Sequence, residues 1–297
     1  MKHQKFEVVH DEAMLVGECP LWHPVEYALY WVDIDGFSVH RVHPASGKYS
    51  VWRTPSEPSA LALAEDGLVV ATRRGFIHLN TTSGALTDIA PSPFDTATTR
   101  FNDGRVDPLG RFWVGTMYEP RNAPAAEMYV LECGKVRRAW AGGMTNSNGL
   151  AFSPDGRTMY HADTTTHRID RYGFDAARGT VSGPTPFRVF DTDKTAPGYG
   201  GRPDGAAVDS EGCYWIAMYE GGRILRFSPD GELLRELAVP VRCPTMVAFG
   251  GADLRTLYIT SASKGRPAGE LATHPLSGKV LCTAVDVAGR EEPFYKP

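Results

Sequence analysis

Three residues with oxygen-bearing side chains occupy one recurring position in this chain. Glu18, Asn148 and Asp204 each open a short apolar segment that leads into a turn. Carboxylate and amide oxygens are the ligands that hard divalent cations such as Ca²⁺ prefer, and the three side chains together carry a charge of −2. Brought together by a fold, they can bind one divalent ion and leave coordination positions for water or a substrate.

Each of these residues also has a purely structural interpretation. A lone Asn or Asp at the start of a strand often hydrogen-bonds to nearby backbone and caps a turn. That explanation suffices for any one of them, whereas their shared position in a repeat favours the cation site. No cluster of histidines or cysteines has the spacing of a zinc site.

The recurring position is defined by the turn that follows it. Asn148 lies eight residues before Gly156, the glycine of a Pro-Asp-Gly turn. Counting back from the other turns, or from matching Pro and Phe residues where the glycine is missing, gives six positions: Glu18, Ser59, Asn102, Asn148, Asp204 and Thr245. They are about 40 to 56 residues apart, and repeats of about 40 to 50 residues with short strands are typical of a propeller. The sequence therefore predicts an all-β fold, a six-bladed β-propeller, forming one domain over residues 1–297.

The elements that position these residues are predicted to be strands. Segments rich in β-branched and aromatic residues, such as 28–34, 38–42 and 49–52, supply the remaining strands of each blade, and no segment keeps a helical period for long. Residues 6–10 are expected to pair with the last blade and close the ring, because closure removes exposed strand edges. The first strand of each blade lines the channel, so the six positions should meet at one channel mouth.

Arg100 and Asn102 are the predicted substrate-binding residues, and Asn102 is itself one of the six positions. Arg100 lies two residues before Asn102 and can share its side of an extended chain. Together they are predicted to hold a hydroxylated substrate by hydrogen bonds, although a surface ion pair also explains Arg100. Asp103 and Asp209 are assigned to turns and to contacts with the backbone of neighbouring blades.

The ends of second strands and one long interval supply candidates for the rim of the site. Tyr118, Glu119 and Tyr219 stand where second strands end. The longest interval contains a glycine-rich insertion at 191–202, just before Asp204. This insertion is either a cover over the site or an inert surface loop, and the sequence does not decide between them.

Composition limits the partners. The net charge of −4 and the scattered Lys and Arg residues argue against nucleic acid and anionic membranes. No apolar run reaches membrane-spanning length, and the first twelve residues lack the apolar core of a signal peptide. Five scattered cysteines without a C-x-x-C pair suit a reducing compartment. A cytoplasmic monomer or weak homodimer that binds a small molecule is expected.

Several linked motifs resemble those of one family, the SMP-30/gluconolactonase/regucalcin-like propellers. They stand at residues 17–22, 100–108, 115–117, 147–150, 203–205 and 221–223, with weaker likeness from 249 to 265. The resemblance implies a Ca²⁺-type site at Glu18, Asn148 and Asp204, with Arg100 and Asn102 holding a sugar lactone. It also implies hydrolysis of aldonolactones to aldonic acids, with Zn²⁺, Mn²⁺, Fe²⁺ or Mg²⁺ as alternative ions.

One position departs from the animal members of that family. They carry a second acidic residue that contacts sugar directly after the position of Glu119, and this chain has Pro120 there. Glu119 remains a candidate substrate-binding residue. The substrate preference of the animal proteins is not transferred to this chain.

The predicted reaction is metal-assisted ester hydrolysis. The cation polarises the lactone carbonyl, and either Asp204 or a hydroxide on the ion acts as base towards the attacking water. A covalent serine mechanism is disfavoured because the chain has no G-x-S-x-G motif. A metal-dependent phosphotriesterase or arylesterase is the first alternative, and a non-enzymatic calcium-binding protein is the second.

Overall fold

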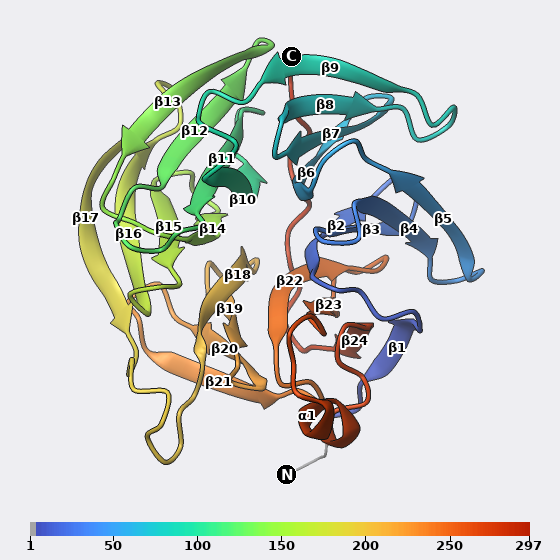
Figure 1. Ribbon diagram of the computed structural model, residues 1–297, viewed down its shortest axis with the longest axis vertical. Helices are drawn as coiled ribbons and strands as arrows, with labels where there is room; N and C mark the ends of the chain where they lie inside the picture. The colour runs from blue at the N-terminus through green and yellow to red at the C-terminus, as the bar shows by residue number, and fades with distance from the viewer. Residues whose placement is uncertain (1–3) are drawn as a thin grey trace.

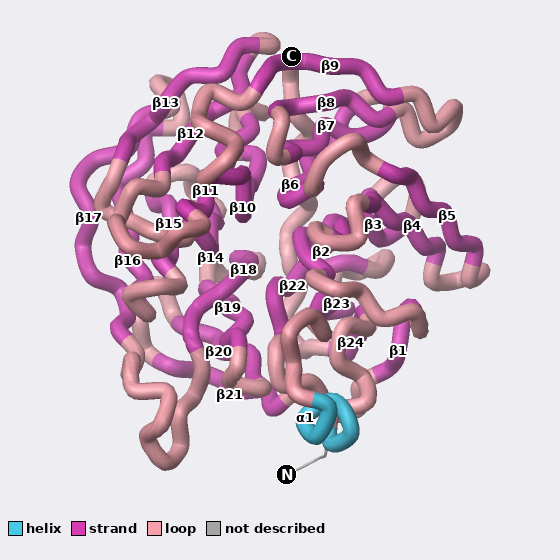
Figure 2. The backbone as a smooth tube through the Cα atoms, in the orientation of Figure 1, coloured by secondary structure: helices cyan, strands magenta, loops and turns pink. Residues whose placement is uncertain are grey.

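The computed structural model describes residues 4–297, which form six four-stranded antiparallel sheets arranged around a central axis (Figure 1). Within this range there is one helix, α1 (Ala268–Thr273), and it is six residues long. The predicted six-bladed propeller is confirmed, as is the lack of any substantial helix. Figure 2 shows the strands grouped in blades, with loops joining them at both ends.

Each blade repeats the same strand order from the axis outwards. The innermost strands are β2 (Gly17–His23), β6 (Pro58–Ala64), β10 (Thr99–Val106), β14 (Ser147–Phe152), β18 (Arg202–Val208) and β22 (Pro244–Gly250). The second strands are β3 (Ala28–Asp33), β7 (Gly67–Thr72), β11 (Phe112–Tyr118), β15 (Thr158–Asp163), β19 (Tyr214–Tyr219) and β23 (Thr256–Ser261). The third strands are β4 (Ser38–His43), β8 (Gly75–Leu79), β12 (Glu127–Glu132), β16 (Arg168–Asp175), β20 (Arg223–Phe227) and β24 (Val280–Ala284). The outer strands are β5 (Lys48–Arg53), β9 (Leu86–Pro91), β13 (Lys135–Ala141), β17 (Thr180–Val189), β21 (Leu233–Ala238) and β1 (Glu7–His10).

Burial falls from the axis to the periphery. Every residue of β6 and β14 is buried, whereas β17 has no buried residue. Inner and second strands are covered on both faces by neighbouring blades, which is why they read as continuous apolar runs. The tryptophans of second strands, Trp31, Trp113 and Trp215, are fully buried in these packed faces. The core is therefore a ring of contacts between blades.

The ring is closed by the first described strand. β1 pairs antiparallel with β24, with Glu7 opposite Cys282, so the start of the chain supplies the outer strand of the last blade. This pairing was predicted from the sequence and is confirmed. It joins segments from the two ends of the chain within one blade, and so covers the edge of β24 that would otherwise be exposed.

Every inner strand contains a one-residue irregularity near its beginning. The pairing with the second strand shifts just after Glu18, after Asn148 and around Asp204. β10, β6 and β22 break in the same way. Such bulges redirect a side chain and are common beside active sites. In β14 the bulge requires Gly149, because its φ is 61° and an added Cβ would collide with the Tyr214 hydroxyl.

The C-terminal tail crosses the opposite end of the channel. After β24 the chain runs through the middle of the ring (Figure 1), where the Tyr295 and Lys296 amides donate to the Leu63 and Gly110 carbonyls at 2.7 and 2.9 Å. Glu292 on the same tail accepts a 2.5 Å bond from Arg105. Leu63 and Arg105 lie near the ends of inner strands, whereas the predicted site residues lie near their beginnings.

The remaining global expectations concern membranes and disulfides. In the described range, no helix combines the length and apolar character needed to cross a bilayer. All five cysteines are unpaired, in agreement with their scattered spacing.

Candidate metal and substrate site

The structure places the three predicted ligands at one end of the channel. Glu18 and Asn148 are the second residues of β2 and β14, and Asp204 is the third residue of β18. Inner strands of a propeller run in the same direction, so these early positions share one mouth. Asn102, Ser59 and Thr245 open their own inner strands in the same way. The repeat counted from turn residues therefore located one ring of side chains.

Asn148 is held in a fixed orientation. It is 2% exposed, and its Nδ2 donates to Thr164 Oγ1 at 2.6 Å. Thr164 Oγ1 in turn donates to the Pro203 carbonyl at 2.8 Å. Because Nδ2 is taken, Oδ1 faces the other way, where it accepts a 2.9 Å bond from Asn102. Thr164, which sequence reasoning did not single out, thus links Asn148 to the residue before Asp204.

The two predicted carboxylate ligands accept at most one hydrogen bond each from the described residues. Glu18 accepts one bond, from the Cys19 amide at 3.0 Å, and Asp204 accepts none from any described side chain or amide. Burial raises the pKa of Asp204 to about 8, with Arg202 opposing that rise and Asp103 adding to it. Burial, and then repulsion from Asp204 and Asp103, raises the pKa of Glu18 well above its usual value. Buried acids that repel one another in this way are stabilised by a bound cation.

Asp103 adds a third carboxylate that was expected to have a structural role. Its Oδ2 accepts a 2.8 Å bond from the Leu150 amide and ties β10 to β14, as predicted. Its Oδ1 is buried and has no partner among the described residues. Burial raises the pKa of Asp103 to about 6.

These donors fit a divalent cation. The mouth offers the Glu18 and Asp204 carboxylates, which accept few hydrogen bonds. The Asn148 amide oxygen has a fixed orientation, and Asp103 Oδ1 nearby has no partner among the described residues. This is an all-oxygen, negatively charged set, which suits Ca²⁺ or a similar hard ion better than a soft one.

Arg100 and Asn102 form a hydrogen-bonded chain that ends at Asn148. Arg100 Nη1 donates to Asn102 Oδ1 at 2.7 Å and to the Phe101 carbonyl at 2.9 Å. Asn102 Nδ2 donates to Ser147 O at 2.8 Å as well as to Asn148. Arg100 is mostly buried, and burial lowers its pKa, so the ion pair that it forms with Glu119 does not lie on the open surface considered as an alternative. Its nearest carboxylate, on Glu119, is 3.8 Å away.

Glu119 lies at the rim and is already engaged by an arginine. Arg73 Nη1 and Nη2 donate to its two carboxylate oxygens at 2.8 Å each, and Arg73 Nε donates to Glu57 at 2.8 Å. The hydrogen bond from Arg73 is the main reason that the pKa of Glu119 is lowered. A substrate hydroxyl at this point would therefore have to share the Glu119 carboxylate with Arg73, another residue that the sequence did not reveal.

The glycine-rich insertion lies against the same rim. Lys194 from the insertion donates to Glu220 Oε2 at 3.0 Å, directly after the end of β19. Glu220 also faces Arg202 at 3.4 Å and Arg266 at 3.0 Å. Since Arg202 opens β18 two residues before Asp204, the insertion lies at the channel mouth beside the candidate site.

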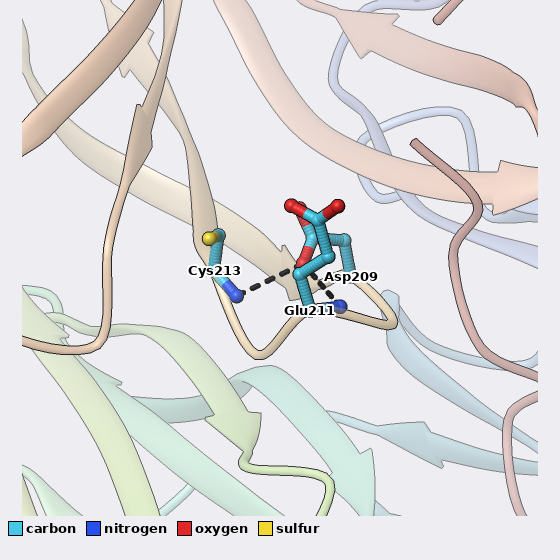
Figure 3. A group of neighbouring side chains, drawn as sticks. All are labelled: Asp209, Glu211 and Cys213. Atoms are coloured by element: carbon cyan, nitrogen blue, oxygen red, sulfur yellow. Dashed lines mark hydrogen bonds between the residues drawn. The ribbon is translucent and has the colours of Figure 1, made fainter. Parts of the chain in front are cut away.

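A different cluster of possible metal ligands lies at the far end of β18. The ligand atoms of Asp209, Glu211 and Cys213 are all within 4.8 Å of one another (Figure 3). Asp209 Oδ1 accepts the amides of Glu211 and Cys213 at 3.0 and 2.9 Å. Its Oδ2 accepts Trp215 Nε1 and Arg226 Nε at 2.9 and 2.8 Å. With four donors on one carboxylate, this cluster is a structural turn, as was predicted for Asp209.

A family model described as SMP-30/Gluconolactonase/LRE-like region matches residues 16–263, a range that contains all six inner strands. The chain belongs to this family. The expected family resemblance is thereby confirmed, and Glu18, Asn148 and Asp204 all lie within the matched range.

Relatives within the family align over nearly the whole chain. A 6-deoxy-6-sulfogluconolactonase from Pseudomonas putida is 45% identical over 294 residues, which is 99% of both chains. Pentonolactonase XacC from Haloferax volcanii is 33% identical and covers 96% of each chain. The crystal structure of a calcium-binding protein, regucalcin, from Agrobacterium tumefaciens superimposes with a TM-score of 0.92 at 32% identity, over 99% of this chain and 98% of that one.

Proposed function

We propose that this protein hydrolyses a sugar lactone to the corresponding aldonic acid with the help of one divalent cation. The observation that carries the proposal is Asp204, a buried carboxylate without a hydrogen-bond donor, beside Asn148 and Glu18 at the channel mouth. Lactonases among the relatives, at 45% and 33% identity, support the same reaction.

Glu18, Asn148 and Asp204 would hold the ion. When bound, the ion supplies a Lewis acid that polarises the lactone carbonyl. Its positive charge also favours the ionised form of Asp204, so that this carboxylate can accept a proton from the attacking water. Ca²⁺ is the first choice for an all-oxygen set, and the calcium-binding relative of known structure agrees with it.

Arg100, Asn102 and Glu119 would bind the sugar. Asn102 has its amide fixed by Arg100 and by the Ser147 carbonyl, which gives a pre-organised partner for a substrate hydroxyl. Glu119 at the rim can accept a second hydroxyl while it stays paired with Arg73. These residues would position the substrate through hydrogen bonds and form no covalent bond to it.

The substrate is expected to be a lactone of a five- or six-carbon aldonic acid, since the names of the two lactonase relatives specify a pentonolactone and a substituted gluconolactone. The five unpaired cysteines support the predicted cytoplasmic location. We keep the expectation of a single-domain monomer or weak homodimer.

The direct test is a screen of aldono-1,4- and 1,5-lactones with several divalent ions, read by acid release. We expect turnover that disappears on chelation and returns with an added ion. Full activity of metal-stripped protein, or of the Asp204→Ala variant, would contradict the proposal. Faster turnover of organophosphates or aryl esters would favour the other hydrolase class, and calorimetric metal binding without any turnover would favour a non-enzymatic binding protein.

A further inference from the structure

A group of charged side chains at the start of β18 is not accounted for by lactone hydrolysis alone. We call Lys194, Arg202, Glu220 and Arg266 the rim cluster. Three cations converge on the one carboxylate of Glu220, at 3.0 Å from Lys194, 3.4 Å from Arg202 and 3.0 Å from Arg266. They come from the insertion, the start of β18 and the loop before α1.

The rim cluster has more positive than negative charge. Arg266 is also held by Glu270, through bonds of 2.7 and 2.6 Å to its two oxygens. Two carboxylates, on Glu220 and Glu270, therefore face three cations within the cluster, and the nearby Asp204 carboxylate belongs to the proposed ion site. Lys194 and Arg266 each make a direct hydrogen bond to Glu220.

Arg202 is the one cation of the rim cluster whose side chain forms no hydrogen bond to a described residue, whereas Lys194 and Arg266 each donate to Glu220. Its approach to Glu220, at 3.4 Å, is longer than a good charge-assisted bond, and no hydrogen bond from Arg202 is formed to any described residue. Its Nε is buried without a partner. Since a guanidinium has five N–H donors, most of those on Arg202 are free for a ligand.

The position of Arg202 is fixed by its surroundings. Its guanidinium carbon lies 5.0 Å from the centre of the Tyr219 ring, and the two residues are paired across β18 and β19. Stacking on an aromatic face leaves the N–H edge of a guanidinium available for an oxyanion. Arg202 opens β18 two residues before Asp204, so its backbone lies at the same mouth as the proposed ion site.

We propose that Arg202, supported by Lys194 and Arg266, forms a subsite for an anionic group on the part of the sugar lactone remote from its carbonyl. The substrate class would then be a lactone carrying a strongly acidic substituent such as a sulfonate. Arginine binds such groups through two parallel N–H···O bonds, which a neutral hydroxymethyl group cannot replace. This inference rests on the proposed lactonase function and adds a specificity-determining residue to it.

The test compares gluconolactone with its 6-deoxy-6-sulfo counterpart. Wild-type protein should show the higher kcat/KM on the sulfonated lactone. In Arg202→Gln the ratio of the two kcat/KM values should fall roughly 10- to 100-fold, as expected for loss of charge-assisted hydrogen bonds. Arg202→Lys should recover part of that ratio. Arg188→Gln is the matched control, because Arg188 also stacks on an aromatic ring, at 5.1 Å from Phe227, but lies on an outer strand.

Two outcomes would overturn the subsite. One is a wild-type protein whose kcat/KM on the neutral lactone equals or exceeds that on the sulfonated lactone. The other is an equal loss on both lactones in Arg202→Gln, which would mean that Arg202 acts only on Asp204 or on the fold. A wild-type protein that hydrolyses no lactone with any ion would instead refute the proposed function.

A measurement without variants covers the case in which Arg202→Gln fails to fold. The 6-sulfonated aldonic acid should inhibit gluconolactone hydrolysis by wild-type protein at least about tenfold more tightly than the unsubstituted acid, and this difference should shrink in concentrated salt. Equal inhibition by the two acids would argue against the subsite.

Discussion

Two aspartates five positions apart, in the blade formed by β18–β21, show opposite uses of a buried carboxylate. Asp204, near the start of β18, receives no hydrogen bond from residues 4–297, whereas Asp209, just after the end of β18, receives four. Both are buried, at 7% and 0% exposed. Burial alone therefore does not distinguish the proposed catalytic acid from the structural one, whereas the number of hydrogen bonds that each accepts does.

The blade formed by β10–β13 shows the same contrast between Asp103 and Asp107. Asp107 accepts the amides of Leu109 and Arg111 through Oδ1, and Arg111 Nε and Trp113 Nε1 through Oδ2. Asp103, four residues earlier, accepts Leu150 alone through Oδ2 and leaves Oδ1 without a partner. In both blades the turn end is saturated with donors that stabilise it, and the mouth end keeps free oxygens at a cost to stability.

The largest effect is expected from the mouth. Asp204→Asn should lower kcat/KM for lactone hydrolysis about 10³-fold or more, because it removes a proposed metal ligand and base together. The metal-free variant should be at least as stable as metal-free wild type, because the substitution removes a buried carboxyl group that accepts no hydrogen bond from the described residues. Steady-state kinetics and thermal denaturation check both parts. A variant with more than about a tenth of wild-type activity would remove Asp204 from the site.

The matching change at the turn end should affect stability instead. Asp209→Ala leaves Arg226, Trp215 Nε1 and two amides without their acceptor, and should lower the free energy of unfolding by about 3–5 kcal/mol. Urea denaturation measures the loss, and Asp107→Ala serves as the equivalent change in the blade formed by β10–β13. If Asp209→Ala kept full stability but lost metal binding, the contrast between the two ends would be wrong.

A smaller effect is expected from the residue that orients Asn148. Thr164→Val removes the acceptor of Asn148 Nδ2 and the donor to Pro203 O with little change in volume. Metal affinity should fall roughly 10-fold, as for other residues that orient a ligand. Calorimetric titration measures the affinity, and Thr166→Val, a nearby threonine whose hydroxyl contacts only the Asp163 carbonyl, is the control. Unchanged affinity in Thr164→Val would show that the amide is held by other contacts.

The smallest effect is a pH dependence of metal-free stability. The pKa of Asp204 rises from 3.8 to about 8 on folding, so the folded state holds a proton that the unfolded state has lost between these values. This group therefore makes the folded state less stable as pH rises from about 4 to 8. Melting temperatures in chelator should fall more steeply with pH for wild type than for Asp204→Asn. Identical slopes would show that Asp204 does not keep a proton in the folded state over this pH range.

The sequence located the ring of site residues because the repeat is marked by local turn chemistry. Each turn glycine or proline lies a fixed distance from the start of its own inner strand, so counting back was enough to find Asn148 and Asp204. It was also enough to predict the six inner strands, while the closing strand β1 was predicted from the need to cover exposed strand edges.

Other parts of the site depend on contacts between distant segments. Thr164 reaches Asn148 from the loop after β15, and Arg73 reaches Glu119 from the neighbouring blade. The Arg202 environment joins the insertion to the loop before α1. The bulges beside the site residues depend on pairing with the second strand. No local pattern marks such positions, because side chains acquire these partners only when the ring closes.

The C-terminal tail packs across the end of the ring opposite the candidate site. Its amides are bonded to the carbonyls of Leu63 and Gly110, and Glu292 is paired with Arg105 beneath the mouth. The tail therefore covers the ends of β6 and β10, on the side of the ring away from Glu18, Asn148 and Asp204. With the tail on that side, we expect a lactone to enter and its acid product to leave at the mouth that carries the candidate site, so that product departure precedes the arrival of the next substrate.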